Sequence, residues 1–494
     1  MALEPVVKKI KAKEVKNITS KNQIECKLDI LEDEIKNVCF TKANATLTSL
    51  ECGDNEVKYF GKAVFAIVLN GDGLKKQEAG VEFSYKIEAN GVKNNDEILA
   101  SVKVENVKIS LQNGIPTVFA TVVFNGNVIV YNETDYIGNV DGVNCKVEEG
   151  EYSVLVQKSK KDFSIEDEFT ADYLVNNVYS HFENVKIQEI SSGIGCAVII
   201  GELEVVMLIE KGVDKQLIVE KRAIPFRFEH DIERAMPDSI ICCNLDVLDT
   251  NIKVFVDEAK GFSTISILNS VKLTSLVYEN QKFSYLTDCY KADKYISFEK
   301  ENKIITKEIG LIILNENVKC DKNVKLYENT LLVCPLFVKI EKIDVETIEN
   351  ESFVKGVVHV GFLTKTEDGY SLQTELVPFE IKVDTLNKIE VLNVSANSLT
   401  LKEDNGILIE FNLSIVISER ETKTISLINA LIEGEDKKVN NSAISVYIPN
   451  KGDTLWDISK CLGVSEDDVL RTNKNLEFPL TGEERIVIYR ELKK

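Results

Sequence analysis

The chain has 494 residues, and its 59 Lys plus Arg against 80 Asp plus Glu give a formal charge of −21. A surface this acidic repels phosphate backbones and anionic lipids, which argues against nucleic acid or a membrane surface as a partner. The length also exceeds what one hydrophobic core covers, so we expect several domains of roughly 100–150 residues.

The first residues, MALEPVVKKIKAKEV, carry charge but lack the apolar segment of a secretory signal. Nowhere does an apolar run reach the roughly 18 residues that a membrane helix needs. These features predict a cytoplasmic protein without a membrane span. The 11 cysteines include no C-x-x-C pair, and we interpret most of them as reduced, buried, small apolar residues.

A glycine followed by an apolar, β-branched run occurs three times along the chain. The runs are FGKAVFAIVL with Gly61, IIGELEVVMLIE with Gly201 and VKGVVHVGFLT with Gly356. Each run is typical of a buried strand. The intervals between the glycines are those of whole domains rather than of short solenoid repeats.

A second strand pattern follows each glycine at a nearly constant distance. It contains Phe83, Phe226 and Phe379, which lie 22, 25 and 23 residues after the three glycines. Apolar and polar residues alternate in these segments, as in strands with one buried face. Farther on, Asn113-Gly114 and Asn405-Gly406 occupy matching places and favour tight hairpin turns.

These repeats predict a mainly β protein made of three tandem antiparallel β domains, each a sandwich or open barrel. A small βααβ domain is expected to follow them. The predicted divisions are 1–146 for an N-terminal arm with repeat one, 150–285 for repeat two, 300–434 for repeat three, 435–443 for a linker, and 444–494 for the C-terminal module.

The C-terminal module has strong local signals. Thr454 stands three residues before Asp457, and Ser465 stands three residues before Asp468, which are the spacings of helix-capping pairs. Gly463 is placed to end the first helix, because glycine accepts the left-handed conformation found there. With SVYI before the helices and RIVIYR after them, the predicted order is strand, helix, helix, strand.

That order, together with the string GDTLWDIS, resembles the LysM module. In such modules two loops form a shallow groove, which typically holds glycans that contain N-acetylglucosamine, such as peptidoglycan. The resemblance implies one wall of the groove from Gly452, Asp453, Thr454 and Leu455, and the other from Asn473, Lys474, Asn475 and Leu476. The ending GEERIVIYR departs from the usual pattern, since Tyr489 stands where proline is common. Both sugar binding and protein binding therefore remain open for this groove.

The three repeats in turn resemble SPOCS domains, which occur in proteins of spore formation. Several SPOCS domains followed by one LysM module is the layout of clostridial proteins that assemble the spore coat. The resemblance implies a non-enzymatic adaptor on the mother-cell side of the forespore, whose LysM module docks the ATP-hydrolysing coat-morphogenetic protein. The alternative is a cell-envelope protein that binds peptidoglycan or other N-acetylglucosamine polymers.

No motif for catalysis, metal binding or cofactor binding is present in the sequence. His181, His230 and His359 belong to no H-E-x-x-H pattern or Cys/His zinc spacing. The sequence also lacks a G-x-S-x-G elbow and a Walker A loop. We therefore expect no catalytic residues, no metal and no cofactor. An enzyme of the cell envelope is the least favoured interpretation. It stays open because a glycosidase needs only two carboxylates that meet in space, and such a pair leaves no sequence signature.

Overall fold

The computed structural model describes residues 4–489, except 72, 95, 213, 325, 327–329, 350, 368, 404–406, 438–441, 475 and 479. The protein is mainly β, as predicted. Within the described ranges, no helix is long and apolar enough to cross a lipid bilayer. The predicted turn at Asn405-Gly406, residues 438–441 of the predicted linker and residues 490–494 lie outside the described residues, and the first two residues of that linker belong to the last long strand, which ends at Asp436.

In the described part of the chain, eighteen long strands precede the C-terminal module, and they fall into three sets of six. The first set is β1 (Glu4–Lys27), β2 (Val38–Gly53), β3 (Glu56–Leu69), β4 (Lys75–Glu88), β5 (Glu97–Gln112) and β6 (Ile115–Asp141), with a 3-10 helix over Glu32–Asn37. The second set is β7 (Asn144–Ala171), β8 (Val175–Gly193), β9 (Cys196–Lys211), β10 (Gln216–Asp231), β11 (Ile240–Asp257) and β12 (Phe262–Tyr290). The third set is β13 (Lys294–Val324), β14 (Leu331–Ile348), β15 (Glu351–Thr366), β16 (Gly369–Val383), β17 (Lys388–Glu403) and β18 (Ile407–Asp436).

All three sets have the same topology. The first, sixth and fifth strands form one sheet with the sixth in the centre, and the second, third and fourth strands form another with the third in the centre. Every pairing between the described strands is antiparallel. The two sheets of a set share a hydrophobic core, because their strands alternate apolar and polar residues and bury the apolar face.

The glycine and phenylalanine that mark each sequence repeat are direct cross-strand partners. The pairs are Gly61 with Phe83, Gly201 with Phe226 and Gly356 with Phe379. A β-carbon on Gly201 would lie 2.5 Å from Cζ of Phe226, and it would also clash with the carbonyl oxygen of Lys186. Glycine is needed here because the phenylalanine ring and a bulged neighbouring strand occupy the space of a side chain.

The basic N-terminal segment is part of the sheet rather than a separate arm. β1 pairs with β6 from Glu4 to Lys27 and buries Ile10, Ile18 and Ile24 on its inner face. Its lysines lie mostly on the outer face, at an edge of the sheet. Charged residues on an edge strand oppose strand-to-strand aggregation.

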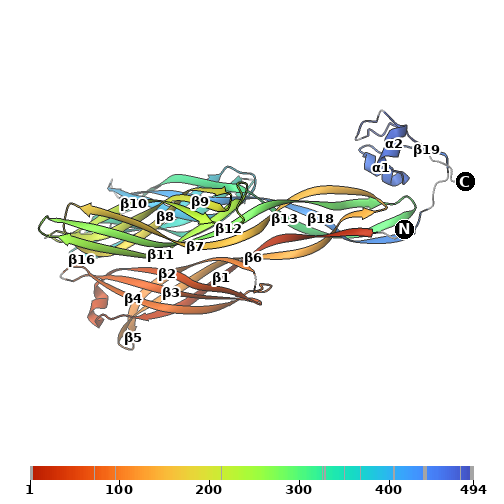
Figure 1. Cartoon of the computed structure of the whole chain (residues 1–494). Coiled ribbons are helices and arrows are strands. Elements are labelled where there is room, and N and C mark those ends of the chain that lie inside the picture. Colours follow the sequence, from red (N-terminus) through yellow and green to blue (C-terminus); the bar gives the residue numbers. More distant parts are fainter. Residues whose placement is uncertain are drawn as a thin grey trace.

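The three sets pack against one another. At one junction, Phe40, Leu208 and Leu336, each from a different set, share one buried cluster. At another, Ile10, Tyr285 and Leu427 do the same. The first and sixth strands of the sets are the longest, and their ends extend together beyond the sandwiches (Figure 1). The second and fifth strands, which are sheet edges, face a common interior space.

The C-terminal module lies beside the end of these long strands (Figure 1). It consists of β19 (Ile444–Tyr447), α1 (Leu455–Leu462), α2 (Glu466–Thr472) and β20 (Ile486–Tyr489), with β19 and β20 antiparallel. Its own small core contains Ile458, Val469, Leu480, Ile486 and Ile488.

Candidate functional site

The first predicted wall of the groove lies between β19 and α1, and its polar side chains form hydrogen bonds within the module. Thr454 is the N-cap of α1, where its hydroxyl accepts from the Asp457 amide at 3.3 Å while Asp457 accepts from the Thr454 amide at 3.0 Å. The carboxylate of Asp453 accepts from the Asn450 amide at 2.8 Å. Leu455 packs against the module core, and Gly452 is exposed with φ of 95°.

The second predicted wall follows α2. The Asn473 side chain donates to the carbonyl of Val487 at 2.7 Å and accepts from its amide at 2.9 Å. It also donates to the carbonyl of Val469 at 2.9 Å, so that it joins α2 to β20. Lys474 is exposed, Leu476 packs against the core, and Asn475 lies outside the described residues.

The turn before β20 is also held by internal hydrogen bonds. Glu484 accepts from the amides of Thr481 and Gly482 at 3.0 and 2.9 Å and from the Thr481 hydroxyl at 2.8 Å. The backbone hydrogen bond from Thr481 is the main reason that the pKa of Glu484 falls to about 2. This carboxylate is therefore ionised at neutral pH and shapes the turn.

Among the predicted groove residues that the structure describes, Gly452, Thr454 and Lys474 are exposed, and the side chains of Asp453, Thr454 and Asn473 are already hydrogen-bonded within the module. A sugar needs several convergent polar groups to orient its hydroxyls. Here the strongest candidates for that role are already bonded to the module itself. Backbone groups and the Lys474 ammonium are what the described part of the groove offers to a ligand.

The module also exposes several large apolar side chains. Ile444, Val446, Ile448 and Tyr489 are 58%, 59%, 71% and 60% exposed. Ile444 pairs with Tyr489 across β19 and β20, and Val446 lies two residues along, so these side chains share the face of the sheet opposite to the core. We call these three side chains, together with exposed Ile448 directly after β19, the outer apolar face.

A contact that sequence reasoning missed joins the module to β12. The indole Nε1 of Trp456 donates to Asp288 at 2.8 Å, and Nζ of Lys460 lies 2.7 Å from both carboxylate oxygens of Asp288. Tyr290 meets the Trp456 ring edge-on at 5.0 Å, and its hydroxyl donates to the carbonyl of Val464 at 2.6 Å. The motif indicated that Trp456 matters, but nothing in the sequence pointed to a partner 168 residues away.

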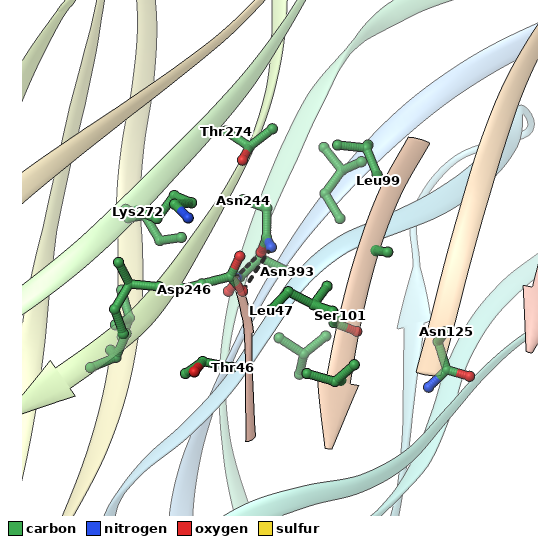
Figure 2. Close-up of a pocket in the computed structure, with 18 of the residues that line it drawn as sticks. Thr46, Leu47, Leu99, Ser101, Asn125, Asn244, Asp246, Lys272, Thr274 and Asn393 are labelled. Atoms are coloured by element: carbon green, nitrogen blue, oxygen red, sulfur yellow. Dashed lines mark hydrogen bonds between the residues drawn. The ribbon is translucent and has the colours of Figure 1, made fainter. Parts of the chain in front are cut away.

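A second candidate site is a cavity of about 570 Å³ between the three sets of strands. The edge strands β2, β5, β8, β11, β14 and β17 contribute most of its lining. Figure 2 shows the polar cluster on one wall, where Asn393 donates to Asn244 at 3.3 Å and Asn244 donates to Asp246 at 3.1 Å. Lys272 lies on the strand beside Asp246. Burial raises the pKa of Asp246.

The histidines do not come together. His230 is buried, with its ring nitrogens 2.8 Å from the Ser159 hydroxyl and 3.2 Å from the Ser275 hydroxyl, and burial lowers its pKa. His181 and His359 lie on other strands, β8 and β15. Among the described residues, no group of three or more His, Cys, Asp or Glu side chains has a metal-binding arrangement.

Comparison with protein-family models, with curated proteins and with solved structures found no match for this chain.

Proposed function

We propose that the protein is a non-enzymatic adaptor of the SPOCS-plus-LysM type that acts in spore-coat morphogenesis. Its C-terminal module docks a protein partner, and the coat-morphogenetic ATPase is the partner that the resemblance implies. The three β-rich sets carry the module at one end, where Trp456 and Lys460 contact Asp288 of β12. The adaptor needs no catalytic residues, metal or cofactor of its own.

The outer apolar face is the observation that carries this proposal. Four large apolar side chains more than half exposed on one small module form a surface that water solvates poorly. Such a surface fits the apolar core of a protein interface. The predicted groove favours a sugar less, because Asp453, Thr454 and Asn473 are already hydrogen-bonded within the module.

Capture of coat proteins from sporulating cells tests the adaptor role. The full chain is compared with a chain that lacks residues 444–494 and with the Ile448→Glu variant, using Leu31→Glu as the matched control on another exposed apolar residue, 73% exposed. We expect the ATP-hydrolysing coat protein to be captured by the full chain and by Leu31→Glu only. Equal capture by the full chain, the truncated chain and both variants would show that the module does not bind this partner.

The glycan alternative requires a separate measurement. Full-length protein is titrated with N-acetylglucosamine oligomers by calorimetry. We expect no heat of binding at millimolar sugar. Binding that weakens in Lys474→Ala but not in Ile448→Glu would favour the envelope alternative over the adaptor.

A further inference from the structure

Two cysteines face each other where β7 and β12 pair near the C-terminal module. Cys145 and Cys289 are direct partners in the antiparallel register. Cys289 is buried, Cys145 is partly buried, and both pack into the cluster that contains Ile137 and Leu286. Directly opposed residues of an antiparallel pair project to the same face, so the two thiols share one apolar space.

The spacing of such a pair is close to that of a disulfide. Opposed Cα atoms in antiparallel strands are about 4.5–5.5 Å apart, inside the range of about 4.4–6.8 Å that disulfides span. Opposed Cβ atoms are about 4.5–5.5 Å apart, compared with about 3.8 Å in a disulfide, so the strands must approach by about 1 Å. The register shift between Leu286 and Asp288 provides a local irregularity that can absorb this movement.

The same strand segment holds the module. The amide of Cys289 donates to Oδ1 of Asp288 at 2.9 Å and so orients its carboxylate. That carboxylate accepts from Trp456 and pairs with Lys460. A movement of Cys289 toward β7 therefore displaces the group to which the module is bound.

From this geometry we infer that Cys145 and Cys289 are a modification site: a dithiol that forms a reversible cross-strand disulfide and thereby loosens the docking of the C-terminal module. The oxidant is a small-molecule disulfide. Neither part of this inference depends on the adaptor proposal, because both are measured without a partner.

The reaction consists of two thiol–disulfide exchanges. The Cys145 thiolate attacks one sulfur of oxidised glutathione and releases one glutathione thiolate. The Cys289 thiolate then attacks the Cys145 sulfur of this mixed disulfide and releases the second. Two protein thiols are oxidised while one disulfide is reduced to two thiols. Burial raises the pKa of Cys145, and it raises the pKa of Cys289 to about 12, so we expect slow exchange at neutral pH that speeds up as pH rises.

The test uses full-length protein carrying Cys461→Ser, because Cys461 is exposed and would itself react. The protein is treated with oxidised glutathione, and peptide mapping identifies which cysteines are joined. Trp456 is the single tryptophan of the chain, so its emission reports the docking contact. Cys145→Ser removes the pair, and Cys52→Ser is the matched control, since Cys52 faces Val57 across the strands.

We expect a linked Cys145–Cys289 peptide together with a shift of Trp456 emission to longer wavelength, both reversed by dithiothreitol. The shift should persist in Cys52→Ser and vanish in Cys145→Ser. Failure to find the linked peptide, or a linked peptide with unchanged emission, would overturn the inference. An emission shift that survives in Cys145→Ser would overturn it as well.

Discussion

Glu308 is fully buried, and residues from all three sets of strands surround it. Nζ of Lys13 lies 2.9 Å from its carboxylate, and Nε of Arg420 lies 3.0 Å from it. Ser418 donates to the same carboxylate at 2.7 Å, and Lys13 also donates to the Tyr278 hydroxyl at 3.1 Å. Burial alone would raise the pKa of Glu308, but Lys13 and Arg420 outweigh it and hold the pKa below its usual range.

Replacing Glu308 by glutamine should destabilise the protein strongly. The Glu308→Gln variant leaves buried Lys13 without the carboxylate it pairs with, while Arg420 keeps its ion pair to Glu390. Loss of one partner of a buried pair costs about 3–5 kcal/mol. The measurement is the urea midpoint at pH 7. Glu133→Gln is the control, because Glu133 pairs with Lys9 and Lys11 at the surface, where loss of an ion pair changes stability little. Equal midpoints for the two variants would contradict the prediction.

The contribution of Glu308 should also disappear in acid. Its folded-state pKa is lower than its unfolded value, so its stabilising effect is present above the ordinary value of 4.5 and is lost as pH falls through the lowered pKa. The urea midpoints of wild type and Glu308→Gln should therefore converge as pH is lowered below 4.5. A gap of constant size across that range would show that the charge of Glu308 is not what stabilises the fold.

Gly201 should tolerate no side chain. In Gly201→Ala, the new β-carbon meets the Phe226 ring and the Lys186 carbonyl, and overpacking of this kind costs about 1–3 kcal/mol. Gly310→Ala is the matched control, because no atom lies within 4 Å of a β-carbon there. Thermal unfolding should show a lower midpoint for the first variant and little change for the second. The reverse order would refute the role given to the Gly–Phe pair.

At the scale of elements, the helix boundaries of the C-terminal module could be predicted from local sequence signals. The capping pair Thr454 and Asp457 and the left-handed Gly463 bound α1 as their spacing predicted. Contacts between distant elements gave no such signal. Asp288 is one of many carboxylates in an acidic chain, and only the folded β12 brings it to Trp456. Asn473 is a second example. Its position in the sequence indicated a groove residue, but its side chain is hydrogen-bonded to Val487 and so joins α2 to β20.

Asn473→Ala should unfold the module selectively. It removes the hydrogen bonds to Val487 and Val469, and each buried polar group left without a partner costs about 1–3 kcal/mol. Hydrogen exchange of residues 444–489 should become faster, while exchange in β1–β18 stays as in the wild type. Lys474→Ala, one residue away and exposed, should leave both regions unchanged. Unaltered exchange in Asn473→Ala would mean that this side chain is free for a ligand after all.

At the scale of the whole molecule, the repeat was visible in the sequence but its packing was not. Strand spacing and the Gly–Phe landmarks predicted three similar β units. Phe40, Leu208 and Leu336 look like ordinary strand residues, although each is buried by the other two sets. Alternation of apolar and polar residues shows which side chains share one face of a strand. It does not show which of those side chains contact a neighbouring unit, because that depends on how the units pack together.

This packing implies that the sets are not independent folding units. A fragment of residues 144–290 alone would expose Tyr179, Leu208, Tyr285 and Leu286, which are buried against neighbouring sets. Exposing each large apolar side chain costs about 1.5–3 kcal/mol. The summed cost for these four residues is therefore comparable to the whole free energy of unfolding of an ordinary domain. Calorimetry should therefore show one main unfolding transition for β1–β18 in the full chain and a much lower or absent transition for the fragment. A fragment that melts sharply at the temperature of the full chain would establish independent domains instead.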